Sequence, residues 1–172
     1  MKRSRGFSLI ELLIVVAIIL IIAAIAIPNL LRAKIAADEA SATNSIRSIN
    51  TAEFAYNASF PSSGYANSLD NLGGISPCTP SAAAACLIDN VLATAIVGSA
   101  GKSGYVFAAT GLVPNGAANL SFVSAASPID YNRSGVRNFC STEDGVIRWD
   151  AGAPGSVPVN SLAACRAFNV ME

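Results

Sequence analysis

The sequence predicts an α+β protein in which one long N-terminal helix packs on a small antiparallel sheet of about four strands. Three observations lead to this fold class. An unbroken apolar run near the N-terminus is followed by helix-forming residues, with few helix breakers until Asn57. Short β-favouring stretches recur in the second half of the chain. The pair Asp144-Gly145 lies between the last two of these stretches and favours a hairpin there.

The first element is an apolar helix long enough to cross a lipid bilayer. The 21-residue segment from Phe7 to Ile27 would be about 31 Å long as a helix. By the positive-inside rule, the basic residues that precede it would keep the N-terminus cytoplasmic and direct everything after Ile27 outward. The alternative is a secretory signal peptide with its cleavage site at residues 24–26. The preceding basic residues are Lys2, Arg3 and Arg5.

Glu11 interrupts this apolar segment. A carboxylate within a membrane helix costs roughly 2.5 kcal/mol or more even on lenient insertion scales, so Glu11 should have a partner. Within the chain, Ser8 as N-cap and Glu11 at the third helical position would form a capping box. The apolar region of a secretory signal is usually free of charge, so Glu11 favours a helix that is kept.

The segment Gly6-Phe7-Ser8-Leu9-Ile10-Glu11-Leu12-Leu13, followed by apolar residues to Ile27, resembles the class III signal of type IV pilins and type II secretion pseudopilins. The shared features are a short basic leader, a glycine, an aromatic residue, a glutamate four residues later and an apolar helix with Pro28 at its end. The resemblance covers about the first thirty residues and implies a pilin-like fold.

The resemblance implies a processing and assembly pathway. In this family a prepilin peptidase cuts after the glycine, here Gly6, and methylates the new N-terminal amine, here that of Phe7. Glu11 would then meet the N-terminal ammonium of a neighbouring subunit as subunits leave the membrane for a helical filament, a pairing that compensates its buried charge. The precursor would be a single-pass inner-membrane protein whose partner is an inner-membrane assembly platform, and the mature protein would reach the cell surface in an extracellular pilus.

Four regions are expected along the chain. A helix from Phe7 to Tyr56 would contain 50 residues and be about 75 Å long, so its apolar half would need lipid or copies of itself. The second half is amphipathic, and its apolar residues are spaced to share one face: Leu31, Ile35, Ala42, Ile46, Ile49 and Tyr56. The regions are a leader (1–6), a membrane and filament-core helix (7–30), an amphipathic continuation (31–57) and a globular part with a disulfide-closed C-terminal loop (58–172).

Pro28 is expected to weaken the helix. It has no N–H to donate to the carbonyl of Ala24 and its ring clashes with that carbonyl, so a kink or local melting is predicted between Ala24 and Pro28. This weak point would let the rod unwind or bend when subunits pack.

The globular part begins with a long loop and ends with the sheet. Residues 57–74 are rich in Ser, Asn, Gly and Pro, which indicates a loop. The Asp144-Gly145 pair favours a tight two-residue turn between the last two predicted strands. The four predicted strands are Tyr105 to Ala109, Leu120 to Ser124, Val136 to Ser141 and Val146 to Trp149.

Four cysteines permit three disulfide pairings. Disulfides are the default in an oxidising exterior, and closure of short loops favours Cys78 with Cys86 and Cys140 with Cys165. The second pair resembles the C-terminal disulfide loop of many pilins.

The composition argues against most other functions. The chain has no histidine, which removes histidine-based catalysis and histidine metal ligands, and its equal numbers of basic and acidic residues give no electrostatic footprint for nucleic acid. No catalytic residue, metal ligand or cofactor is therefore expected. Two weak ligand hypotheses remain: calcium at Glu143, Asp144 and Asp150, where solvated hairpin-tip charges are favoured instead, and DNA at Arg133, Arg137 and Arg148.

The function that these observations favour is structural. The chain is expected to be a non-enzymatic pilin that polymerises through its N-terminal helix into an extracellular type IV pilus-like filament for adhesion, motility or DNA uptake. The alternative is a pseudopilin that forms a short periplasmic pseudopilus in a type II secretion system.

Overall fold

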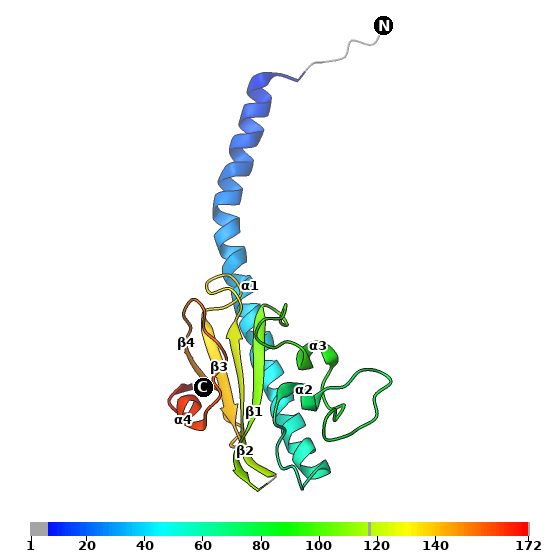
Figure 1. The fold of residues 1–172 in the computed structure, drawn as a ribbon. Coiled ribbons are helices and arrows are strands. Elements are labelled where there is room, and N and C mark those ends of the chain that lie inside the picture. The colour runs from blue at the N-terminus through cyan, green and yellow to red at the C-terminus, as the bar shows by residue number, and fades with distance from the viewer. Residues whose placement is uncertain (1–6, 117, 172) are drawn as a thin grey trace. The chain divides into compact units, whose positions relative to one another are not determined.

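The computed structural model describes residues 7–116 and 118–171. The predicted leader 1–6, with Gly6, lies outside the described residues. The chain divides into two compact units between Lys34 and Ile35. The elements are α1 (Leu9–Ser59), α2 (Leu69–Leu72), α3 (Asn90–Ala93), β1 (Tyr105–Asn115), β2 (Ala118–Pro128), β3 (Arg137–Thr142), β4 (Arg148–Ala151), α4 (Leu162–Arg166) and β5 (Asn169–Val170), as Figure 1 shows.

Helix α1 contains Pro28 in its interior and is continuous through it. The local melting predicted between Ala24 and Pro28 is therefore absent from this structure of the single chain. The proline removes one backbone donor, whereas the turn before it consists of Ala and Ile and the turn after it includes Leu30 and Leu31, all of which favour a helix. The helix also ends at Ser59, slightly later than predicted.

The sheet contains five strands rather than about four. Its order is β1-β2-β3-β4-β5, and all four neighbouring pairs are antiparallel. The missed strand β5 has only two residues, and it is a strand because Asn169 pairs with Trp149 and Val170 with Arg148. Two residues are too few to show the alternation of apolar and polar residues that predicts a strand, so this strand is recognised only from its pairing with β4. The predicted α+β class is confirmed.

The turn between β3 and β4 differs from the prediction. The two strands pair as expected, with Cys140 opposite Arg148, but five residues rather than two connect them. The N–H of Gly145 donates to the carbonyl of Thr142 at 2.9 Å, and Gly145 has a φ of +71°, a left-handed conformation that favours glycine. The Asp-Gly pair thus marks the hairpin correctly but belongs to a longer turn.

The second half of α1 supplies one side of the core. Ala42, Ile46, Ile49 and Tyr56 are buried as predicted. They pack with aromatic side chains from the sheet, where β1 and β2 lie beside α1 in Figure 1. Leu31 is a correction, because 41% of its surface is exposed and it belongs to the first unit.

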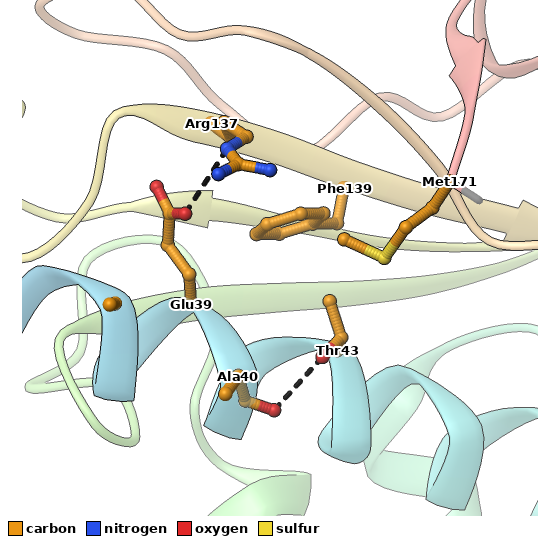
Figure 2. A pocket seen from close by; sticks show the side chains of 7 residues that line it. Glu39, Ala40, Thr43, Arg137, Phe139 and Met171 are labelled. Carbon is orange, nitrogen blue, oxygen red and sulfur yellow. Dashed lines mark hydrogen bonds and ion pairs between the residues drawn. The ribbon is translucent and has the colours of Figure 1, made fainter.

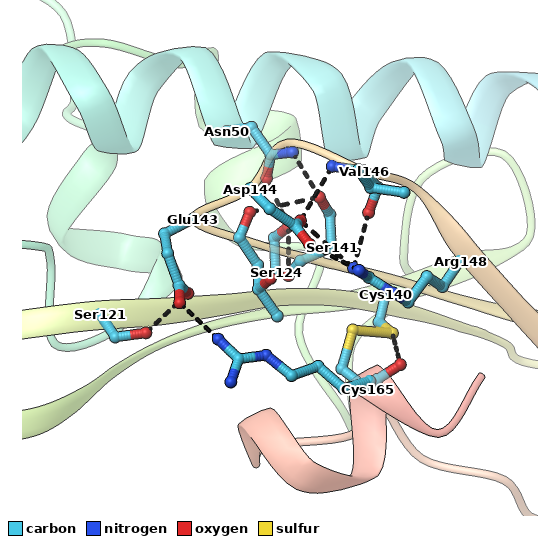
Figure 3. Close-up of polar contacts among 12 residues, drawn as sticks. Asn50, Ser121, Ser124, Cys140, Ser141, Glu143, Asp144, Val146, Arg148 and Cys165 are labelled. Carbon is cyan, nitrogen blue, oxygen red and sulfur yellow. Dashed lines mark hydrogen bonds and ion pairs between the residues drawn. A yellow bond between two sulfur atoms is a disulfide. The ribbon is translucent and has the colours of Figure 1, made fainter. Parts of the chain in front are cut away.

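The opposite face of the sheet has a smaller core. Adjacent residues of a strand point to opposite faces, so Phe139 joins the α1 side while Cys140 joins the other side. There Cys140 and Cys165 pack with Val123 and Ala125. Figure 3 shows α1 and the C-terminal α4 on opposite faces of the strands.

Candidate functional site

Two of the predicted processing and assembly residues, Phe7 and Glu11, lie at the start of α1. Ser8 precedes the first helical residue, and its backbone N–H donates to Glu11 Oε2 at 2.9 Å. This is one half of the capping box that the sequence suggests. Phe7 is 76% exposed and Glu11 is also exposed. The carboxylate therefore caps its own helix in the single chain while remaining accessible to another group.

The first unit presents a continuous apolar surface. All large apolar side chains from Leu9 to Leu31 are at least 41% exposed. By length and composition α1 could cross a membrane, and none of its most apolar stretch is buried within the protein. An exposed apolar surface of this extent requires lipid or another protein surface to cover it.

An ion pair connects the second half of α1 to the sheet. Glu39 Oε1 accepts the N–H of Val136 at 3.0 Å, and Glu39 Oε2 lies 3.2 Å from Arg137 Nε. The Arg137 guanidinium also lies over the ring of Trp149, 5.3 Å from its centroid. Figure 2 shows these charges at the edge of a hollow of about 260 Å³ that includes Phe139 and Met171.

A buried polar network lies further along the same helix. Asn50 Nδ2 donates to Ser141 Oγ at 2.8 Å, and Ser124 Oγ donates to Asn50 Oδ1 at 2.6 Å (Figure 3). Ser124 and Ser141 lie opposite each other on β2 and β3. One side chain of α1 thus bonds to two neighbouring strands and aligns the helix on the sheet.

The β3–β4 turn carries two ion pairs. Asp144 Oδ2 lies 2.5 Å from Arg148, and this hydrogen-bonded guanidinium is the main reason that the pKa of Asp144 falls to about 2. Glu143 accepts from Arg166 at 2.6 Å and from Ser121 Oγ at 2.7 Å. Glu143 and Asp144 therefore have arginine partners in addition to the solvent exposure that the sequence led us to expect.

These pairs weaken both ligand hypotheses. Glu143 and Asp144 already have arginine partners, and the described residues contain no group of three His, Cys, Asp or Glu side chains able to hold a metal ion. Of the three arginines considered for DNA, Arg137 and Arg148 are paired with carboxylates, and Arg133 is exposed. They do not form a patch of uncompensated positive charge.

Two disulfides are present, with the pairing that short loop closure favours. Cys78 is joined to Cys86 and Cys140 to Cys165. Both sulfurs of the second pair are buried between β3 and α4 (Figure 3), whereas Cys78 is exposed. The second disulfide closes the loop between β3 and the C-terminus.

Sequence reasoning missed the buried carboxylates of α1. Glu39 is 7% exposed and Glu53 is fully buried. A usable signal exists, because Glu39, Ala42, Ile46, Ile49, Glu53 and Tyr56 are spaced alternately by three and four residues. Both glutamates are therefore in phase with the apolar stripe and lie on the face that packs against the rest of the unit.

Comparison with known proteins gives matches that cover only parts of the chain. Residues 1–27 match the family described as "Prokaryotic N-terminal methylation motif". The chain is 49% identical over 51 residues to "Type IV major pilin protein PilA" of Myxococcus xanthus, a match that covers 30% of this chain and 23% of that protein. It is 56% identical over 43 residues to "Type IV wide pilus major component PilA4" of Thermus thermophilus, covering 25% of this chain and 33% of that protein.

These matches confirm the resemblance found in the sequence for the N-terminal region. The chain spans between about a quarter and a third of the length of the curated relatives that it matches. No solved structure matches the chain. Between 25% and 30% of the chain is thus homologous to type IV major pilins.

Proposed function

We propose that this protein is a structural subunit that polymerises through α1 into an extracellular type IV pilus-like filament. The observation that carries the proposal is the apolar surface from Leu9 to Leu31, which nothing in the chain covers among the described residues. In the precursor, lipid covers this surface. In the filament, the same surface of other copies replaces the lipid, so the exchange keeps the apolar area away from water.

Two N-terminal groups direct this assembly in our proposal. Cleavage after Gly6 creates a cationic amine on Phe7, which is then methylated and keeps its charge. Glu11 of a neighbouring copy pairs with this amine once the helices leave the membrane. The accessible carboxylate supports this role, because its hydrogen bond to the N–H of Ser8 uses only one of its oxygens. A charge in an apolar surrounding gains most from such a pair.

Glu11→Gln tests the pairing. The variant keeps an oxygen that can accept from the N–H of Ser8, so α1 can still begin at Leu9, but it has no charge for the amine. We expect processed subunits to accumulate in the membrane and the yield of sheared surface filaments to fall at least tenfold. The measurement is the ratio of filament to membrane subunit on immunoblots.

Asp130→Asn is the matched control, because it removes an exposed carboxylate from the β2–β3 connection and should leave the yield unchanged. Normal filament yield from the Glu11 variant would contradict the pairing. Filaments that stay in the periplasm in the unsubstituted strain would instead indicate a pseudopilus.

Pro28 is the second assembly residue that we propose. The carbonyl of Ala24 has no α-helical donor at position 28, so bending or unwinding there loses one hydrogen bond fewer than elsewhere in α1. We expect the helix to be bent or unwound between residues 22 and 28 once subunits pack. A filament reconstruction by electron cryo-microscopy with a straight, unbroken helix through these residues would contradict this role.

A further inference from the structure

Glu53 is a fully buried carboxyl group between α1 and the segment 63–68. Its Oε2 accepts the backbone N–H of Ala66 at 2.8 Å, and Ala66 is fully buried as well. Its Oε1 has no hydrogen-bond partner among the described residues. A fully buried carboxyl group with a single hydrogen bond is poorly suited to hold a negative charge.

The segment 63–68 is fastened to the sheet on its other side. Asn119 of β2 donates from Nδ2 to the carbonyl of Tyr65 at 2.9 Å and to Oδ1 of Asn67 at 2.7 Å. The N–H of Asn119 also donates to the carbonyl of Ser63 at 2.9 Å. Glu53 is thus one contact from α1 to this segment, beside the edge-to-face packing of Phe54 on Tyr65, and β2 holds the segment from its other side.

Glycine allows this close packing. A Cβ on Gly111 of β1 would lie 2.6 Å from the carbonyl oxygen of Ala66, a distance that real side chains do not reach. The segment therefore crosses β1 in close contact, which leaves little room for water beside Glu53 while the segment is in place.

The segments around Glu53, which are residues 50–70, β1 and β2, carry no positive charge. Besides Glu53, the titratable groups of these segments are Tyr56 of α1, Tyr65 of the segment 63–68, Asp70 of α2 and Tyr105 at the start of β1. Residues 50–70, β1 and β2 contain no Lys, Arg or His. An ionised Glu53 would therefore have neither a cation nor a second donor, unlike Glu39, which has Arg137.

We propose that Glu53 is a proton-controlled latch: with its proton bound it holds segment 63–68 against α1, and loss of the proton in neutral to alkaline medium opens this segment locally. Opening admits water to the carboxylate. It also separates Tyr65 from Phe122, whose ring centroids now lie 4.8 Å apart, and so exposes an aromatic side chain that is fully buried. The surface of the globular part would thereby change with the pH of the surroundings.

The direction of the pH effect follows from the burial of Glu53. Burial raises the pKa of this carboxyl group from 4.5 to about 7, and the hydrogen bond from Ala66 lowers it by less. The closed state therefore binds the proton more tightly than the open state. Below pH 4.5 both states are protonated and closure is most favoured. Closure weakens between pH 4.5 and about 7, where the open state has lost its proton and the closed state still holds it. Above about pH 7 neither state holds the proton, and closure changes no further.

Amide hydrogen exchange at Ala66 tests the latch in the full-length chain in non-ionic detergent. The opening constant of this amide is its observed exchange rate divided by the intrinsic exchange rate at the same pH. This constant should rise on the order of a hundredfold between about pH 5 and 9. In Glu53→Gln the constant should be independent of pH, because the amide cannot ionise. Asp70→Asn, which removes an exposed carboxylate on α2, should behave like the unsubstituted protein.

A pH-independent opening constant in the unsubstituted protein would overturn the proposal, as would the same pH dependence in Glu53→Gln. If that variant does not fold, the carboxyl carbon of Glu53 can be titrated by ¹³C NMR in the unsubstituted chain. A midpoint near 7 supports the latch, and a midpoint near 4.5 overturns it.

Discussion

Asn50 illustrates how single polar residues orient the helix on the sheet. Its amide group donates to Ser141 on β3 and accepts from Ser124 on β2, and all three side chains are buried. An apolar residue would fill the same space but would leave both hydroxyl groups without this partner. The buried amide therefore favours one rotation of α1 over neighbouring ones.

Asn50→Ala should destabilise the fold by about 2 kcal/mol, because it removes two hydrogen bonds and leaves two buried hydroxyl groups without their partner. The control is Asn44→Ala on the exposed face of α1, where among the described residues the side chain bonds only to the exposed Arg47. That change should cost about 0.5 kcal/mol or less. Urea unfolding of the full-length chain in non-ionic detergent, followed by Trp149 fluorescence, measures both. Equal midpoints for the two variants would contradict the role of Asn50.

Residues differ in how much of their role the sequence reveals. Glu11 stands out because its neighbours are all apolar, so a local pattern is sufficient to identify it. Glu39 and Glu53 were missed because charged residues in the exposed part of a helix are common. Their burial depends on partners elsewhere in the chain: the partner of Glu39 is 97 residues away in the sequence, and the partner of Glu53 is 13 residues away. Their spacing in phase with Ile46 and Ile49 was the signal available.

At the scale of elements, some helices and strands can be predicted from local sequence patterns, whereas others form only because they pair with a neighbouring strand. The helix and the pairing of β3 with β4 could be predicted, because apolar periodicity and an Asp-Gly turn are local features. The extension of β1 to Asn115 could not, since Gly111 and Pro114 argue against a strand until β2 pairs with them. The same holds for β5, which exists only through its register with β4.

The two disulfides should differ in their reaction with reductant. Cys140 and Cys165 are fully buried, whereas Cys78 lies in an exposed loop. Under native conditions a mild thiol reductant followed by alkylation should label Cys78 and Cys86 first, because thiol–disulfide exchange requires access to a sulfur. Peptide mass mapping measures the labelled positions. Denaturant serves as the control, since it should make all four cysteines react.

Simultaneous labelling of all four cysteines without denaturant would contradict this order.

The two disulfides should also differ in how much each contributes to the stability of the fold. The second disulfide closes 25 residues and should contribute about 3.5 kcal/mol, against about 2.5 kcal/mol for the 8-residue loop of the first, on a chain-entropy model.

At the scale of the whole molecule, the two units satisfy their apolar residues in different ways. The second unit has its own core on both faces of its sheet. The first unit has an exposed apolar surface and no core of its own among its described residues. A chain built this way is complete only when lipid or other copies cover α1, which is the physical basis of the proposed filament.

The most direct measurement is the intact mass of the subunit recovered from sheared surface filaments, with fragmentation from its N-terminus. We expect a chain that begins at Phe7 and is heavier by one CH₂ unit, because a methyl group replaces a hydrogen of the amine. A mature chain that begins at Ile27 would contradict this expectation, because the apolar segment would then be a discarded signal and neither Glu11 nor the Leu9–Leu31 surface could take part in assembly.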